Sequence, residues 1–357
     1  MDKTLQALFA LLRAGLWGRY DEAMASAFPL SAQEWGRVFT MARQQTVTGI
    51  AFRGLDYLPE EAAPPMGLMA KWMAHADCIE QSNRMMNETV AKLFGHFSAS
   101  GIEAVLQKGQ GIAAMYPEPL LRECGDIDIY FPGHDGVSDP LAGIAGAVRE
   151  RQPDDSWTYV VDGIIVEHHA DLVDIQSPRA RKYVKKLIGG KGFERTVISN
   201  GTEVNIPAPE VNLLLLSSHI LKHAFGVGIG LRQFCDYAVA CRYYEGRVNE
   251  GDMREMWRRI GLEKWEELLE GFVRRFLDSD CSFARNDSKK TDVLLDVVLK
   301  GGNFGVYSKD YEKKSRTQLV RKMHTFKSLA GNVSFAFRYA PREWFWTVRQ
   351  LLGGQFR

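Results

Sequence analysis

The chain has 357 residues, too many for one small domain and enough for two or three packed segments, and its hydrophobic share of 45% can build a sizeable core. Its net charge of +1 excludes a whole-chain attraction to nucleic acid or anionic lipid and leaves only local basic patches to provide one. Five scattered cysteines without a CxxC pair, and no apolar run long enough to span a membrane, predict a cytoplasmic protein with reduced thiols and no membrane partner.

Residues 1–100 are predicted to form an N-terminal helical segment. Apolar residues recur at three- and four-residue spacing in residues 5–16 and 34–55, which is the period of an amphipathic helix. A proline-rich break at 59–67 separates them from a long helix that begins near Lys71 and ends near Gly101.

Residues 101–208 are predicted to form an α+β core with a small mixed sheet. Strands are expected at 102–107 and 126–131, with a helix at 140–150. Two hairpins follow, one around Asp162-Gly163 and one around Asn200-Gly201, because such pairs suit tight hairpin turns. A helical excursion separates the hairpins, and residues 209–357 are predicted to form a C-terminal helical domain.

The sequence GDIDIYF places two carboxylates on alternate residues of an otherwise apolar strand. Asp126 and Asp128 would point to one face of that strand, with Ile127 and Ile129 on the other. Carboxylates spaced in this way can hold a divalent hard cation such as Mg²⁺. Glu167, in the middle of another strand, is the expected third ligand. The alternative is an exposed strand end with ordinary solvated acids.

A second feature precedes the acids. The strand at 102–107 runs into Gly109-Gln110-Gly111, which opens a helix, and backbone N–H groups at such a turn favour a phosphate. Lys108 and Arg122 can add positive charge. A phosphate-binding turn beside a metal-binding acid pair is the arrangement used for phosphoryl and nucleotidyl transfer.

These motifs resemble the signature of the uncharacterised bacterial nucleotidyltransferase family, within the DNA polymerase β-like nucleotidyltransferase superfamily. The similar segments are residues 105–131, then Val166-Glu167-His168-His169, then a helix with His219 and His223, then Arg232 and Asp236. In order along the chain, they span roughly residues 102–240.

The resemblance implies a nucleotidyltransferase core flanked by helical segments. Asp126, Asp128 and Glu167 would hold Mg²⁺ or Mn²⁺ and would be the catalytic residues, and Gly109 with its neighbour would form the nucleotide-phosphate turn. It also implies a nucleoside triphosphate as substrate. Two positions depart from the superfamily's usual pattern: Gln110 stands where Ser or Gly is common, and the third acid is Glu rather than Asp.

Two further residue pairs are candidates for a place in the site. His219 and His223 share one face of a helix and can bind zinc only with a third ligand, so contact with substrate or a place in the core is the preferred interpretation. Arg232 and Asp236 either line the active cleft or form a buried pair that joins two helices.

The histidines after Glu167 point to opposite faces of their strand, and His169 is the one on the face of Glu167. It could approach the metal, although a packed histidine is the preferred interpretation. If Glu167 is not the third ligand, Asp171 and Asp174 are the fallbacks.

Two basic runs, at 179–195 and 313–327, fit either solvated helix faces, which is the preferred interpretation, or a surface for a polyanion such as RNA. The sequence thus predicts a metal-dependent nucleotidyltransferase that moves a nucleoside monophosphate to an unidentified small molecule, protein or RNA. A non-catalytic nucleotide-binding or regulatory protein and a toxin-like transferase acting on tRNA are the alternatives.

Overall fold

The computed structural model of the chain describes residues 1–20, 22–133, 148–151, 156–226, 228–278, 291–301 and 332–353. The chain forms two compact units. Unit 1 comprises Met1–Thr40, Val47–Leu172 and Lys191–Ala208, and unit 2 comprises Met41–Thr46, Val173–Gly190 and Pro209–Arg357. Among the described residues, no helix combines the length and the apolarity needed to cross a membrane.

Unit 1 begins with helices, as the apolar spacing predicts. In chain order these are α1 (Lys3–Trp17), α2 (Glu22–Ala27), α3 (Ala32–Gln44), α4 (Thr48–Gly54) and, after two short 3₁₀ turns, α5 (Met66–Ala99). Asp2 caps α1 by accepting a 2.6 Å hydrogen bond from the backbone N–H of Thr4. Pro65 directly precedes α5, where a missing N–H costs the helix nothing.

Helices α1 and α4 cross with their backbones almost touching. A Cβ atom on Gly15 would overlap the carbonyl oxygen of Ile50, and one on Gly54 would overlap that of Leu11. Glycine is therefore required at both positions because any side chain would push the helices apart.

We predict that Gly54→Ala lowers the free energy of unfolding by about 3 kcal/mol, since the new methyl group must displace backbone rather than a flexible side chain. Urea denaturation followed by circular dichroism measures the change. Gly36→Ala in α3 is the matched control, because nothing lies within 4 Å of its Cβ position and alanine there should stabilise by about 0.5–1 kcal/mol. Equal stability of the two variants would contradict the close crossing.

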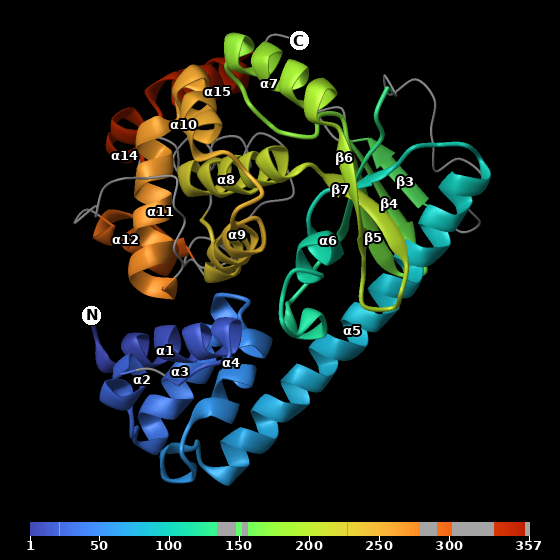
Figure 1. Ribbon diagram of the computed structural model, residues 1–357. Helices are drawn as coiled ribbons and strands as arrows, with labels where there is room; N and C mark the ends of the chain where they lie inside the picture. The colour runs from blue at the N-terminus through green and yellow to red at the C-terminus, as the bar shows by residue number, and fades with distance from the viewer. Residues whose placement is uncertain are drawn as a thin grey trace. The chain divides into compact units, whose positions relative to one another are not determined.

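The centre of unit 1 is a seven-stranded mixed sheet in the order β3-β4-β5-β2-β1-β7-β6 (Figure 1). Its strands are β1 (Val105–Leu106), β2 (Ile127–Tyr130), β3 (Val148–Arg151), β4 (Trp157–Val161), β5 (Ile164–His169), β6 (Phe193–Val197) and β7 (Glu203–Pro207). The pairs β1–β7 and β2–β5 are parallel and the other four are antiparallel. The predicted α+β fold with a mixed sheet is confirmed.

Both predicted hairpins form. Asp162 and Gly163 have φ values of 52° and 80° between β4 and β5, and Gly201 has a φ of 83° between β6 and β7. The prediction of a helix at 140–150 is wrong for residues 148–150. Val148–Arg151 is instead strand β3, which pairs with β4. Ladder hydrogen bonds to β4 override the local preference there, and residues 140–147 lie outside the described part of the chain.

Helix α5 covers one face of the sheet (Figure 1). Its buried residues Met86, Val90, Leu93 and Phe97 belong to one apolar cluster with side chains from the strands. The strand members of that cluster are Leu106, Ile127, Ile129, Tyr159, Val161, Val166, Val204 and Ile206. Because successive strand residues alternate, the residues between them are directed to the opposite face.

Unit 2 is helical among its described residues. Its helices are α7 (Pro178–Lys191), α8 (Pro209–Phe225), α9 (Leu231–Tyr243), α10 (Glu250–Ile260), α11 (Glu263–Leu277), α12 (Asp292–Gly301), α14 (Val333–Tyr339) and α15 (Pro341–Gly353). Large aromatic side chains fill its core: the rings of Phe234 and Phe272, from α9 and α11, lie 4.5 Å apart between centroids, and Trp257 and Trp265 are buried.

A buried carboxyl lies in this core. Glu266 is 3% exposed and accepts a 2.7 Å hydrogen bond from the hydroxyl of Ser217 and another from that of Tyr237. Burial raises the pKa of Glu266 to about 7, although both hydrogen bonds act against the shift. An acid whose folded pKa lies above its unfolded value of about 4.5 binds protons more strongly in the native state.

The stability of the wild type should therefore fall as pH rises from about 4.5 to about 7. We predict that Glu266→Gln removes this fall and is more stable than the wild type at pH 8, by roughly 3 kcal/mol, because glutamine stays neutral. Its carbonyl oxygen can accept one of the two hydrogen bonds, and the other hydroxyl can turn to accept from its amide N–H. Denaturant unfolding across pH 4–8 tests it, with Glu263→Gln at an exposed position of α11 as control. Parallel pH profiles for the wild type and Glu266→Gln would reject the assignment.

Candidate functional site

The pairing register of the sheet brings the glycine turn and the acidic residues together. Strand β1 runs antiparallel to β2, with Leu106 opposite Ile129, and the N–H of Gln107 donates to the carbonyl of Asp128 over 3.0 Å. The residues that follow β1 therefore lie beside the start of β2. Strand β5 runs parallel to β2 on its other side, with Glu167 opposite Asp128.

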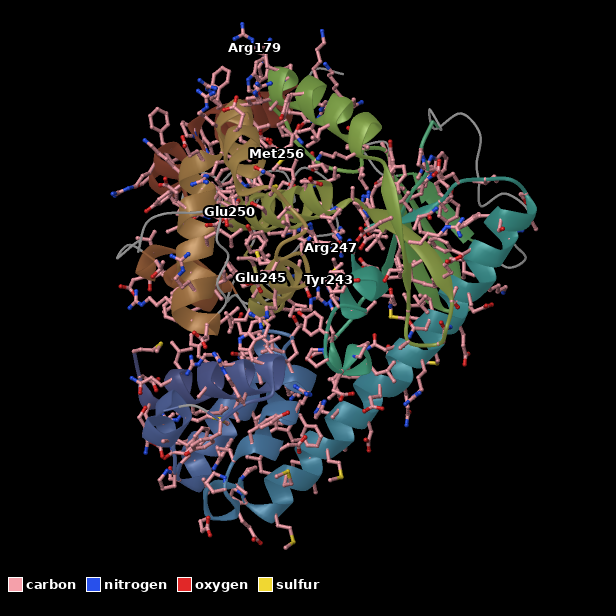
Figure 2. The ribbon with its side chains drawn as sticks, viewed as in Figure 1. Arg179, Tyr243, Glu245, Arg247, Glu250 and Met256 are labelled. Carbon is pink, nitrogen blue, oxygen red and sulfur yellow. The ribbon has the colours of Figure 1, made fainter. Side chains whose placement is uncertain are left out.

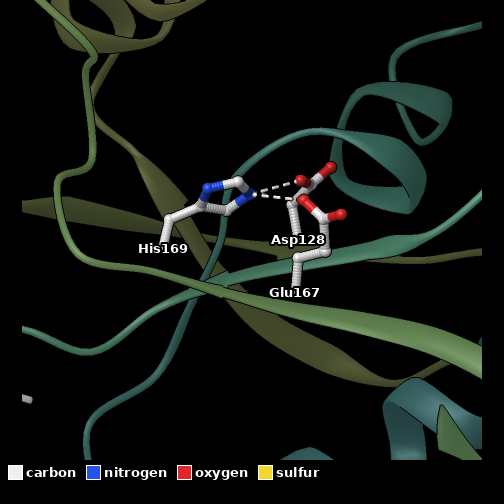
Figure 3. Close-up of side chains that lie close together, drawn as sticks. All are labelled: Asp128, Glu167 and His169. Carbon is white, nitrogen blue, oxygen red and sulfur yellow. Dashed lines mark hydrogen bonds and ion pairs between the residues drawn. The ribbon is translucent and has the colours of Figure 1, made fainter. Parts of the chain in front are cut away.

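Three side chains with potential metal-ligand atoms meet on the sheet face opposite α5. Figure 3 shows Asp128 from β2 with Glu167 and His169 from β5. One ligand atom from each lies within 4.8 Å of the other two. Nε2 of His169 is 2.6 Å from Oδ1 of Asp128 and 3.5 Å from Oε2 of Glu167. The predicted meeting of Asp128 and Glu167 is therefore confirmed.

Lys108 supplies a positive charge to this cluster. Its Nζ lies 3.1 Å from Oδ1 of Asp128, and the two side chains are only 15% and 5% exposed. Burial disfavours the ionised carboxyl of Asp128, but the ammonium of Lys108 and the hydrogen bond with His169 outweigh burial and hold its pKa well below the ordinary value. Burial also opposes the charge of Lys108, and the carboxylates of Asp128 and Asp126 outweigh it and raise the pKa of that lysine.

The donor set of the cluster fits a divalent cation. Two carboxylates and an imidazole offer three ligand atoms on one face, and Asp128 is shielded from water. Carboxylate oxygens suit Mg²⁺ and Mn²⁺, while an imidazole ligand shifts the preference away from Mg²⁺ toward later transition metals.

Asp126 takes a different position from the one expected. Strand β2 begins at Ile127, so Asp126 is the residue before the strand and is half-buried. It does not belong to the three-residue group that meets within 4.8 Å in the described part of the chain. Its backbone carbonyl oxygen nevertheless lies beside the glycine turn, 3.3 Å from the position of a Cβ atom on Gly109, and its charge helps to raise the pKa of Lys108. Its role as a metal ligand stays a prediction.

The glycine turn has the backbone that its sequence predicts. Gly109 adopts a left-handed φ of 50°, and a Cβ atom there would lie 3.3 Å from the carbonyl oxygen of Asp126. A side chain would therefore be strained by conformation and crowded by the start of β2. The helix that the turn opens, α6 (Gly109–Ala113), has only five residues, too few for a strong helix dipole, and the predicted binding of a phosphate there stays a prediction.

Gln110 and Arg122 make structural contacts. Gln110 is 2% exposed, and its Nε2 lies 3.4 Å from the sulfur of Met86 on α5. Arg122 is 3% exposed, and its guanidinium donates to the sulfur of Cys124 over 3.0 Å. The backbone carbonyl of Arg122 accepts a 2.8 Å hydrogen bond from Asn83. Contact of either side chain with a nucleotide stays a prediction.

The two histidines of β5 have different environments. His168 is buried on the α5 side, with its ring 4.8 Å from that of Phe131 between centroids, and it is the packed histidine of the pair. His169 joins the acids instead, so the preferred interpretation of it as a packed residue is not what the structure shows. The alternation of strand residues from Glu167 was the signal for this position. The fallback ligands Asp171 and Asp174 are not part of the cluster described above.

The remaining predicted residues lie in unit 2. His219 and His223 on α8 have ring centroids 4.5 Å apart, but no third metal ligand joins them among the described residues. Arg232 and Asp236 are one turn apart on α9, and Asp236 is 3% exposed. Their predicted place at the active cleft stays a prediction.

A family model described as an uncharacterised nucleotidyltransferase matches residues 31–278, which is more than half of the chain. The chain belongs to this nucleotidyltransferase family. No curated protein and no solved structure matches the chain significantly. Family membership identifies a transferase that uses a nucleoside triphosphate and whose acceptor is unknown.

We predict that Asp128→Asn destabilises the metal-free nucleotidyltransferase by about 2 kcal/mol at pH 7, because it removes a charged partner from the shielded Lys108. The folded pKa of Asp128 lies below its unfolded value, so the difference should be complete above about pH 4 and shrink as pH falls further. Urea unfolding in the presence of a chelator measures it.

Asp162→Asn is the matched control for this prediction, because it breaks the ion pair of Asp162 with Lys92, whose side chains are 57% and 50% exposed. Its effect should stay below about 1 kcal/mol. An Asp128→Asn protein as stable as the control would show that the Lys108 contact adds nothing.

Proposed function

We propose that the protein transfers a nucleoside monophosphate from a nucleoside triphosphate to an acceptor, with a divalent metal ion held by Asp128 and Glu167. The observation that carries the proposal is the meeting of these carboxylates on paired residues of β2 and β5, beside the turn that follows β1. His169 is proposed as a further ligand and Asp126 as an acid that completes the site from the residue before β2. Membership in the polymerase β-like superfamily is part of the same proposal.

The chain's own groups have separate roles in this scheme. The backbone N–H groups at Gly109 and its neighbour are proposed to bind a phosphate of the triphosphate, which they can approach because Gly109 has no side chain. Lys108 is proposed to balance the negative charge of the acids and phosphates. A bound divalent ion would supply Lewis-acid stabilisation of the charge that develops on the phosphates.

The buried position of Gln110 bears on the alternative of a non-catalytic nucleotide-binding protein. That alternative rested on glutamine replacing the usual serine or glycine. Because the Gln110 side chain is buried with its amide nitrogen beside Met86 of α5, the replacement is accommodated by packing and gives no argument against turnover.

We predict that the protein releases pyrophosphate from at least one nucleoside triphosphate in the presence of Mg²⁺ or Mn²⁺ and cell lysate as the acceptor source. Asp128→Asn should lower the rate by a factor of about 100 or more, since a group aligned with transition-state charge is lost, and a chelator should abolish the reaction. Asp162→Asn should retain the wild-type rate. Full activity of Asp128→Asn would rule the site out.

The acceptor is proposed to carry negative charge, with RNA as the leading class. Helix α7 has no acidic residue, and its basic residues Arg179, Lys182, Lys185 and Lys186 are exposed; Figure 2 labels Arg179 on this helix. A face of this kind favours a phosphate backbone. The second basic run, at 313–327, lies outside the described residues. Labelled nucleotide transferred into the RNA fraction of the lysate supports this class, whereas label in protein or small molecules assigns the acceptor to those.

A further inference from the structure

Lys108 supplies a positive charge to the acid cluster from within the chain. Nζ of Lys108 and Nε2 of His169 both contact Oδ1 of Asp128, at 3.1 Å and 2.6 Å. Glu167, on the paired residue of the neighbouring strand, adds a second negative charge. Like charges at paired positions destabilise a sheet unless a cation lies between or beside them. Lys108 satisfies that requirement in the nucleotide-free protein.

A divalent ion bound by the same carboxylates would compete with this ammonium. Lys108 and the ion would share Asp128 as a partner, and two cations that contact one carboxylate in a shielded site repel each other strongly. Free metal can therefore bind tightly only if Lys108 gives up its 3.1 Å contact with Asp128, and the loss of this shielded ion pair opposes metal binding.

The position of Lys108 gives it an alternative partner. It directly precedes Gly109, at the turn proposed to bind the triphosphate, and its long side chain has several rotatable bonds. A triphosphate bound at that turn would bring anionic oxygens near the lysine. The ammonium could then move from the carboxylate to a phosphate as the metal takes its place.

We propose that Lys108 is a resident counter-ion of the acid cluster, and that a nucleotide together with a metal ion, rather than a metal ion alone, displaces it. The inference rests on the proposed function, because it takes Asp128 and Glu167 as metal ligands. Displacement of Lys108 makes the binding of metal and of nucleotide cooperative. Each ligand then raises the affinity for the other by the same factor. The protein would bind little metal until its substrate arrives.

The test measures the binding of Mn²⁺ alone to the full-length protein at pH 7.5, from the electron paramagnetic resonance signal of the free ion. Lys108→Gln should bind Mn²⁺ about tenfold or more tightly than the wild type, because the competing charge is gone. Lys108→Arg, which keeps that charge, should bind it as weakly as the wild type. Lys92→Gln removes a lysine from the exposed pair with Asp162 and should change nothing, which controls for net charge.

A second measurement uses a non-hydrolysable nucleoside triphosphate analogue. Mn²⁺ should increase the affinity of the wild type for the analogue by a larger factor than it does for Lys108→Gln. This comparison cancels the affinity of the metal for the analogue itself. If Lys108→Gln does not fold, Lys108→Ala takes its place in the same comparison, and equal coupling in that variant and the wild type would overturn the inference.

The outcomes separate this inference from the proposed function. Mn²⁺ binding that is abolished by Asp128→Asn but is equally tight in the wild type and Lys108→Gln overturns the role of Lys108 and leaves the metal site in place. Absence of Mn²⁺ binding by Lys108→Gln overturns the inference as well, and the pyrophosphate assay then shows whether the proposed function fails with it.

Discussion

The pairing of Asp128 with Glu167 is the constraint around which unit 1 is arranged. Parallel pairing of β2 and β5 puts two carboxylates side by side on one face, where they repel each other and one is almost fully buried. The fold places a cation, Lys108, and a hydrogen-bonding imidazole, His169, beside these acids. Lys108 follows the end of β1, and His169 lies two residues after Glu167 on the same strand. Both side chains contact Asp128.

Helix α5 makes this arrangement rigid from the other side of the sheet. Its apolar residues pack against Ile127, Ile129 and Val166, which fixes the faces that the acids occupy. Its polar residues reach the connecting segments. Asn83 donates to the carbonyls of Leu120 and Arg122 before β2, and Asn87 donates to Ser199 in the β6–β7 hairpin. One helix thus supports both the sheet and the loops beside the site.

The family match extends beyond the sheet. It covers residues 31–278, which include α7 to α11 of unit 2 as well as the strands of unit 1. The buried Glu266 network and the paired histidines of α8 therefore lie inside the segment that defines the family. Among the described residues of unit 2, helix α7 carries an exposed basic face without acidic residues.

Local patterns in the sequence were enough to predict the two hairpins, the glycine turn and the common face of Glu167 and His169, because turn residues and strand alternation act over a few positions. They could not predict that Val148–Arg151 is a strand, that Gln110 and Arg122 are buried, or that Lys108 and His169 meet on one oxygen of Asp128. Those facts depend on strand order and register between segments up to about 40 residues apart. Only the packed sheet and helix α5 decide which distant residues become neighbours, since cross-strand pairing has no counterpart in the local sequence.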